Sequence, residues 1–219
     1  IDRCGRDMVL SLSPGPAPVS EHEHLAANAN MWRITNDFWD DWALLKNMFT
    51  RCEIWQSHVG PGCWPDCDML PLGRIGVRFG QPRQTRFTPD EQKTMLTLWS
   101  IFRSPLILGA ELPSLDEATL RLLTNRDVLR LNRHSFGARQ IVRDDAHAVW
   151  VSQDEDGSRY AALFNLSEKP REVSLDLREL EGETFACREL WSGEECTAQE
   201  TLSCVIEPHG ARLFRCTEC

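Results

Sequence analysis

The sequence predicts an α/β fold over about residues 1–134, followed by an all-β sandwich over about residues 135–219. Two observations support this division. In the first part, short apolar segments alternate with segments of helical periodicity, as in parallel β/α units. In the second part, short strand-like segments follow one another between turn residues, as in a small antiparallel sandwich. The change falls between Arg133 and Ala138.

The first part contains four expected β/α units. Strands are expected at 8–12, 31–34, 68–70 and 105–108, and helices at 21–29, 40–50, 88–102, 116–123 and 126–131. The third helix is marked most clearly, because Thr88, Pro89 and Glu91 form a capping-box pattern at its start. Four units cannot close an eight-stranded barrel and would leave open strand edges. We therefore expect the remaining units to come from preceding sequence or from a second chain.

The second part contains six expected strands, separated by turns such as Asp-Gly, Ser-Gly and Pro-His-Gly. They are expected at 148–151, 160–164, 172–177, 184–190, 202–206 and 211–215. Six strands within about 80 residues are typical of a sandwich rather than of a parallel sheet.

Composition excludes several classes of protein. The net charge of −9 argues against a nucleic-acid partner, because binding to phosphates needs clustered Lys and Arg. No apolar run approaches the ~18 residues of a membrane span. A neutral or cationic small substrate is compatible with this charge, whereas oligomeric state and compartment stay open.

Nine cysteines make an odd count, so at least one is free or pairs between chains. The Cys63/Cys67 and Cys216/Cys219 pairs leave zinc as an alternative, but they lie far apart in the chain. Free thiols are the favoured interpretation; they are more common in reducing compartments, but they do not fix the compartment of this chain. We expect no metal and no cofactor.

The segment 32–42 combines three tryptophans with Arg33 and several carboxylates, among them Asp37. This is the chemistry of a sugar site, because indole faces stack on pyranose rings and a guanidinium donates hydrogen bonds to hydroxyls. A carboxyl group can transfer the proton on a glycosidic oxygen. The alternative is the start of a core helix with tryptophans as filler.

Four motifs of this chain resemble glycoside hydrolase family 27, which contains α-galactosidases and α-N-acetylgalactosaminidases. They are Trp32-Arg33-x-x-x-Asp37 with Asp40-Asp41-Trp42, Gly60-Pro61-Gly62-x-Trp64-x-Asp66-x-Asp68-Met69-Leu70, Trp99-Ser100-Ile101-Phe102-Arg103-Ser104-Pro105-Leu106, and Leu123-Thr124-Asn125-Arg126-Asp127-Val128-Leu129. The resemblance runs from about Gly5 through the sandwich, so it covers nearly the whole chain.

The resemblance implies the second half of a (β/α)8 TIM barrel, with strands five to eight, followed by a C-terminal antiparallel β-sandwich domain. It further implies a glycoside hydrolase that needs no metal. The expected function is that of a retaining exo-α-galactosidase, which removes terminal α-linked galactose from oligosaccharides or glycoconjugates. Alternatives are an α-N-acetylgalactosaminidase, a β-L-arabinopyranosidase, or a non-catalytic carbohydrate-binding remnant.

By the same resemblance, Asp37 is the general acid/base of the reaction. The family nucleophile is an aspartate at the end of strand four, and nothing in this chain matches it. We therefore expect this chain alone to be inactive, as a fragment that lacks the nucleophile half. A capping role for Asp37 is the alternative, although Asp40 or Asp41 suits the following helix better.

Other site residues follow from the resemblance. Arg33 is expected to hold a substrate hydroxyl and the acid, with a structural salt bridge as the alternative. Asp66, Asp68 and Trp64 are expected to support the site. Ser13 stands where animal-type α-galactosidases carry a glutamate against the sugar 2-hydroxyl, and a serine there makes room for an acetamido group.

Overall fold

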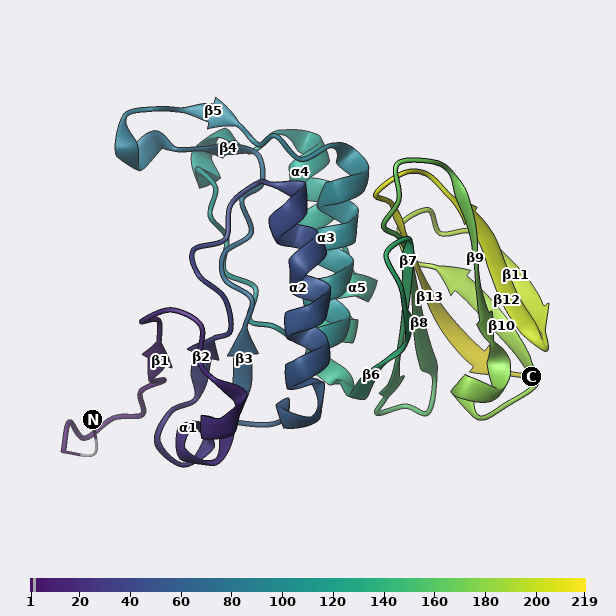
Figure 1. Ribbon diagram of the computed structural model, residues 1–219, viewed down its shortest axis with the longest axis horizontal. Coiled ribbons are helices and arrows are strands. Elements are labelled where there is room, and N and C mark those ends of the chain that lie inside the picture. The colour runs from purple at the N-terminus through teal and green to yellow at the C-terminus, as the bar shows by residue number, and fades with distance from the viewer. Residues whose placement is uncertain (2) are drawn as a thin grey trace.

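The computed structural model describes residue 1 and residues 3–219. The chain forms two parts that pack side by side (Figure 1). One part is a small parallel sheet with helices, and the other is a β-sandwich. Helices α2 (Trp42–Trp55), α3 (Pro89–Phe102) and α5 (Arg126–His134) lie between the parallel sheet and the sandwich. A partial α/β domain followed by an antiparallel sandwich is the fold class that the sequence predicts.

The parallel sheet has the order β1 (Ser11–Leu12), β2 (Met31–Arg33) and β3 (Trp64–Asp66). The expected strand at 68–70 is wrong: the strand ends at Asp66, and the backbone turns at Asp68, which has a φ of 74°. The strand expected at 105–108 is reduced to a single parallel bridge between Leu108 and Leu70. Without neighbouring strands on both sides, this edge of the sheet stays short.

The helical elements agree with the sequence pattern in number, and their ends are set by caps. Besides the three helices above, the structure contains α1 (His22–Asn28), α4 (Glu117–Leu123) and the 3₁₀ turns η1 (Val19–Glu21), η2 (Gln56–His58), η3 (Val77–Phe79) and η4 (Leu112–Ser114). The predicted capping box of Thr88 and Glu91 is confirmed. Helix α2 starts later than expected because the Asp41 carboxylate accepts from the N–H groups of Ala43 and Leu44.

The sandwich is one continuous antiparallel ladder of eight strands in the order β6-β7-β8-β13-β10-β11-β12-β9. The strands are β6 (Ser135–Arg143), β7 (His147–Asp154), β8 (Arg159–Asn165), β9 (Arg171–Asp176), β10 (Thr184–Glu189), β11 (Glu195–Gln199), β12 (Thr201–Ile206) and β13 (Ala211–Glu218), with a further 3₁₀ turn η5 (Leu177–Leu180) after β9. All six predicted strands are present. Strands β6 and β11 were not predicted, because β6 is interrupted by bulges and β11 is mostly exposed, so neither shows an apolar alternation.

Strand β7 is buried on both faces. Ala148 and Trp150 belong to the core shared with the helices, whereas Val149 and Val151 face the inside of the sandwich. Strand β8 alternates in the same way. Because successive side chains of a strand point to opposite faces, these strands join the two parts through one layer of backbone.

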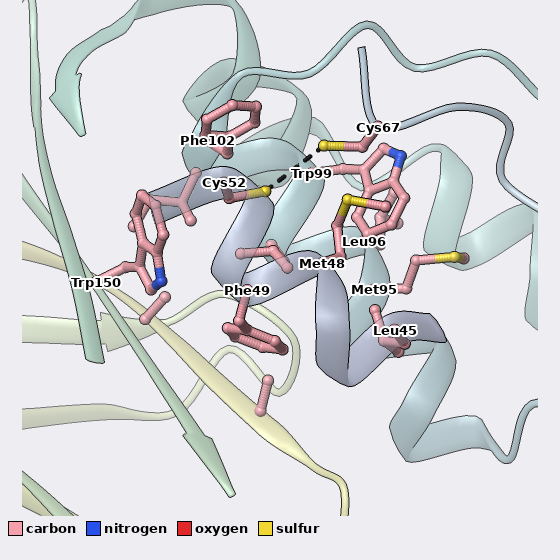
Figure 2. Close-up of a cluster of buried hydrophobic side chains, with 14 of the residues drawn as sticks. Leu45, Met48, Phe49, Cys52, Cys67, Met95, Leu96, Trp99, Phe102 and Trp150 are labelled. Atoms are coloured by element: carbon pink, nitrogen blue, oxygen red, sulfur yellow. Dashed lines mark hydrogen bonds between the residues drawn. The ribbon is translucent and has the colours of Figure 1, made fainter. Parts of the chain in front are cut away.

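Helix α3 is the centre of the molecule, and ten of its residues are buried (Figure 2). Trp99 and Phe102 are fully buried beside side chains of α2. The ring of Phe102 packs edge to face on that of Trp150 of β7, with their centroids 6.3 Å apart. Polar positions on α3 are buried as well, and two of them find hydrogen-bond partners in the sandwich. Thr94 donates to the carbonyl of His209 at 2.6 Å, and Thr97 accepts from the Trp191 indole at 3.0 Å.

A buried carboxylate also links α5 to the sandwich. Arg130 donates two hydrogen bonds to Asp154, whose side chain is fully buried, and the Tyr160 hydroxyl donates a third at 2.6 Å. Burial would raise the pKa of Asp154, but the bonds from Arg130 and Tyr160 outweigh it and hold the pKa at about 2.

We predict that Asp154→Asn lowers the free energy of unfolding by about 2–3 kcal/mol, somewhat less than for a fully buried pair because Arg130 keeps part of its hydration. The folded pKa of Asp154 is depressed from 3.8 to about 2, so its contribution is present above about pH 4 and is lost as pH falls through about 2. Urea unfolding at several pH values measures it. Glu117→Gln, in an exposed pair with Arg121, is the control and should change little. A loss for Asp154→Asn that is equally large at pH 2 and pH 6 would contradict the assignment.

Candidate active site

Arg33 and Asp37 lie together beyond the carboxyl end of β2. Arg33 is the last residue of the strand, and its Nη2 lies 3.3 Å from Asp37 Oδ1 and 2.9 Å from Asp68 Oδ2. The Arg33 side chain is 10% exposed, whereas that of Asp37 is 88% exposed. The buried guanidinium of Arg33 thus pairs with the largely buried carboxylate of Asp68 and with the exposed carboxylate of Asp37, which a ligand can reach.

Asp68 is fixed from several directions. Its carboxylate also accepts from the N–H of Phe38 at 2.7 Å, and its carbonyl accepts from the Trp99 indole at 3.0 Å. Its own N–H donates to Asp66 Oδ1 at 2.8 Å, which stabilises the turn after β3. Burial raises the pKa of Asp66, and the neighbouring charge of Asp68 adds to the rise. Asp66 and Asp68 therefore orient Arg33 and the segment that carries Asp37.

Two buried donors near this site have no acceptor among the residues that the structure describes. They are Nε of Arg33 and Nε1 of Trp32. A buried donor without a partner costs about 1–3 kcal/mol, so such groups usually bind a ligand, a water molecule or a further segment of protein.

A cavity of about 480 Å³ adjoins the Arg33–Asp37 pair. Its walls include Trp39, Met69 and Glu111, together with the hairpin formed by β4 (Arg74–Ile75) and β5 (Arg83–Gln84). The hairpin carries Phe79 at its tip, with its ring centroid 6.2 Å from that of Trp39. The cavity thus combines an acid, a guanidinium and two aromatic rings.

The base of the hairpin is bound to Asp40. Arg83 donates two hydrogen bonds to this buried carboxylate, and the N–H of Arg86 donates another at 2.6 Å. Burial would raise the pKa of Asp40, but the bonds from Arg83 and Arg86 outweigh it and lower the pKa. Directly after β4, Gly76 has a φ of 76°, and a Cβ there would collide with the Gln81 carbonyl oxygen.

The structure brings Arg33, Asp37, Asp66 and Asp68 together, whereas Ser13 and Trp64 do not line the cavity beside them. Ser13 is exposed in the loop after β1 and does not line the cavity. Trp64 lies at the amino end of β3, where the Arg103 guanidinium covers its ring at 4.7 Å.

The three tryptophans of the segment 32–42 have different surroundings. Trp32 is 1% exposed in the core, so for this residue the filler interpretation is right and sugar stacking is wrong. Trp42 stacks on His209 with centroids 3.9 Å apart, and only Trp39 lines the cavity. Capping by Asp37 is also excluded, because Asp41 caps α2.

Several residues of the cavity carry no signal in the sequence. Arg74, Phe79 and Glu111 reach it through a hairpin and a loop that are distant in the chain, and Arg74 pairs with Glu111 at 3.0 Å. Such long-range pairs have no local periodicity.

Within residue 1 and residues 3–219, no three potential metal ligands of the His, Cys, Asp and Glu types gather in one place. The two cysteine pairs of the zinc alternative lie in different parts of the molecule. The sulfur of Cys67 is 3.6 Å from that of Cys52 in the α/β part, and the sulfur of Cys216 is 3.2 Å from that of Cys187 in the sandwich. None of the described helices has the length and apolarity needed to cross a membrane.

Comparison with known proteins identifies both parts of the chain. The profile described as Alpha galactosidase A matches residues 1–134, and that of the alpha galactosidase C-terminal beta sandwich domain matches residues 144–216. The chain belongs to glycoside hydrolase family 27.

Members of family 27 that resemble this chain have different activities. The β-L-arabinopyranosidase of Geobacillus stearothermophilus is 50% identical, with a TM-score of 0.96 over 100% of this chain and 52% of that one. A Bacillus halodurans protein, provisionally described as an α-N-acetylgalactosaminidase, is 41% identical, with a TM-score of 0.85 over 100% of this chain and 52% of that one. Alpha-galactosidase D of Emericella nidulans is 33% identical over 85% of this chain and 28% of its own length. The family 27 chain thus spans about half of its solved relatives.

We predict that Asp40→Asn detaches the hairpin of this family 27 chain. Loss of charged hydrogen bonds worth about 1.5–3 kcal/mol should raise the population of the open hairpin roughly tenfold or more. Trypsin cleavage after the exposed Arg78 at the hairpin tip measures this population. Asp90→Asn, in a loose exposed pair with Lys93, is the control. An unchanged cleavage rate for Asp40→Asn would show that another contact holds the hairpin.

Proposed function

We propose that this chain supplies the acid/base half of a retaining glycoside hydrolase that removes terminal β-L-arabinopyranosyl residues, with α-D-galactosides as slower substrates. The observation that carries the proposal is the 50% identity to the Geobacillus stearothermophilus β-L-arabinopyranosidase over the entire chain, against 33% to α-galactosidase D. A variant of that arabinopyranosidase has been crystallised in complex with arabinose. The two sugars share the configuration of their ring hydroxyls, and arabinopyranose lacks only the exocyclic CH₂OH group.

In this proposal Asp37 protonates the glycosidic oxygen and later takes a proton from water. Its exposed carboxylate at the edge of the cavity can reach a leaving group, and Arg33 holds it by an ion pair. The unpartnered Nε of Arg33 is free to donate to a sugar hydroxyl or to the missing half of the barrel. Retention requires a nucleophilic carboxylate about 5–5.5 Å from the acid, and the preceding barrel half would supply it.

The cavity beside Asp37 supports the proposal that this half of the barrel binds the leaving group of the substrate. Trp39 and Phe79 are amphipathic or apolar rings beside the acid, and rings of this kind stack on sugar faces. The salt bridge of Arg74 with Glu111 offers polar partners in the lining of the same cavity. Terminal sugar recognition would then depend mainly on the preceding half, and the leaving group on this one.

The test is an assay of the protein extended upstream of Ile1 through a complete barrel. We predict that kcat/KM for nitrophenyl β-L-arabinopyranoside exceeds that for nitrophenyl α-D-galactopyranoside, by roughly 10–200-fold if one CH₂OH group is excluded. Asp37→Asn should lower turnover of natural disaccharides by ~10²–10⁴-fold and that of activated aryl glycosides by less, because a good leaving group needs little protonation.

A higher kcat/KM for the galactoside would make the protein an α-galactosidase and overturn the preference. Equal losses for both substrate types in Asp37→Asn would remove Asp37 from the acid role. If no reading frame extends upstream and the chain binds sugars without cleaving them, the non-catalytic carbohydrate-binding alternative holds.

A second activity, on α-N-acetylgalactosaminides, is favoured by Ser13 and by the 41% identity to the Bacillus halodurans protein. The loop of Ser13 lies near the site, because Ala17 donates to the Arg33 carbonyl at 2.8 Å and Gly15 adjoins the side chain of Asn36. We predict that Ser13→Glu in the completed protein lowers the kcat/KM ratio of the acetamido sugar to the galactoside by roughly 10–200-fold. An unchanged ratio would show that Ser13 is remote from the sugar 2-position.

A further inference from the structure

Three cysteines lie in a row across adjacent strands of the sandwich, far from the candidate active site. Cys187 on β10 is directly opposite Cys216 on β13, and on its other side it is directly opposite Cys196 on β11. The sulfurs of Cys187 and Cys216 are 3.2 Å apart. All three thiols are free.

The strand pairing meets the main geometric requirement of a disulfide for both pairs. Directly opposite residues on antiparallel strands have Cα atoms ~4.5–5.5 Å apart, and disulfides form at Cα separations of ~4.4–6.8 Å. A small rotation about the side-chain bonds therefore suffices for Cys187 to bond to either neighbour. No backbone movement is needed.

The three thiols differ in their access to solvent. Cys216 is fully buried and Cys187 is 2% exposed, whereas Cys196 on β11 is exposed. A reagent in solution can therefore reach Cys196 most directly. Cys187 borders the same cavity as Cys196, of about 540 Å³, but its side chain is almost completely covered, and Cys216 does not border it. We therefore expect the buried pair to be oxidised through the exposed neighbour.

The electrostatic surroundings favour Cys187 as the attacking sulfur in an exchange. The hydrogen bond with Cys216 lowers the pKa of Cys187, and the same contact raises the pKa of Cys216. Partial burial raises the pKa of Cys196, which makes its sulfur the slower nucleophile toward a reagent in solution. The thiolate is the species that attacks a disulfide.

We propose that Cys196, Cys187 and Cys216 form a thiol relay that carries a disulfide from a low-molecular-weight disulfide, such as oxidised glutathione, to the buried Cys187–Cys216 pair. The Cys196 thiolate first attacks the reagent, RSSR, which forms a mixed disulfide and releases one RS⁻. The Cys187 thiolate then attacks the sulfur of Cys196 and releases the second RS⁻. Finally Cys216 loses its proton and attacks Cys187, and Cys196 returns as a thiol. In total, two protein thiols are oxidised, and one RSSR is reduced to two RSH.

The product places the bond where solvent thiols have little access. A Cys187–Cys216 disulfide would join β10 to β13 inside the sandwich, in the same core cluster as Phe185, and Cys196 would again be the most exposed thiol beside it for its reduction. The relay is thus a covalent modification site entered through Cys196. The relay does not involve Asp37 or the cavity beside it. A failure of the relay would therefore leave the proposed function untouched, and the reverse also holds.

The test follows the disulfide in the full chain by peptide mass spectrometry. Cys219→Ser serves as the background, because Cys216 and Cys219 otherwise share one tryptic peptide after Arg215. The reduced protein is incubated with oxidised glutathione at mildly alkaline pH, alkylated and digested with trypsin. We expect a linked pair of peptides, 179–188 with 216–219, that contains Cys187 and Cys216.

Two variants test the order of the steps. Cys196→Ser should abolish the linked pair, and its circular dichroism and melting temperature should stay unchanged because the side chain is exposed. Cys187→Ser should trap a glutathione adduct on Cys196 within peptide 189–212, with the site assigned by fragmentation because Cys204 lies in the same peptide. Cys4→Ser, which removes another exposed thiol, is the matched control and should leave the rate unchanged.

Two results would overturn the relay. One is formation of the Cys187–Cys216 link in Cys196→Ser at the rate of the parent protein, which would show that the buried pair is oxidised directly. The other is the absence of that link in the parent protein under conditions in which Cys4 acquires glutathione. This result would show that no thiol–disulfide exchange occurs between the three cysteines.

Discussion

The turn at Asp68 is the constraint on which the candidate site depends. Its left-handed backbone, with a φ of 74°, directs the carboxylate back toward β2, where it holds both Arg33 and the N–H of Phe38. A non-glycine residue in this conformation costs about 1 kcal/mol or more, so its surroundings must impose it. Asp66 binds its N–H and Trp99 binds its carbonyl. The site therefore rests on β3 and on α3, which are its rigid supports.

Helix α3 in turn connects the site to the sandwich. A helix that is buried nearly all round must find partners for its polar groups, and here they come from chain more than ninety residues away. Glu91 shows this most directly, because it completes the capping box through one oxygen and accepts from His209 through the other. His209 also stacks on Trp42 of α2. The sandwich is thus part of the packing that holds the α/β part, and its removal would leave α3 with unpaired polar groups.

The same structure explains why half of a barrel can present an ordered site. Asp68 pairs with Arg33, and its N–H donates to Asp66 at the end of β3, whereas Asp37 stays exposed and the Arg33 Nε has no acceptor among the described residues. Strand β1 is the edge of the parallel sheet, and the unpaired donors of Trp32 and Arg33 belong to its neighbour β2. The chain spans about half of the solved family 27 structures that it matches, and within that half these residues already form an ordered arrangement.

The sequence by itself determined the family, the two-part organisation and the identity of the residues around Arg33. These depend on short-range patterns: capping residues such as Thr88, the alternation of apolar positions, and motifs within about ten residues. Only the tertiary structure decided that Trp32 is core while Trp39 lines a cavity, that Asp40 anchors a hairpin through Arg83, and that the third strand ends at Asp66. Each of these outcomes depends on a partner far away in the chain. Packing and ion pairs at that separation leave no periodicity in the sequence, because they are fixed by how the elements meet and not by where each begins.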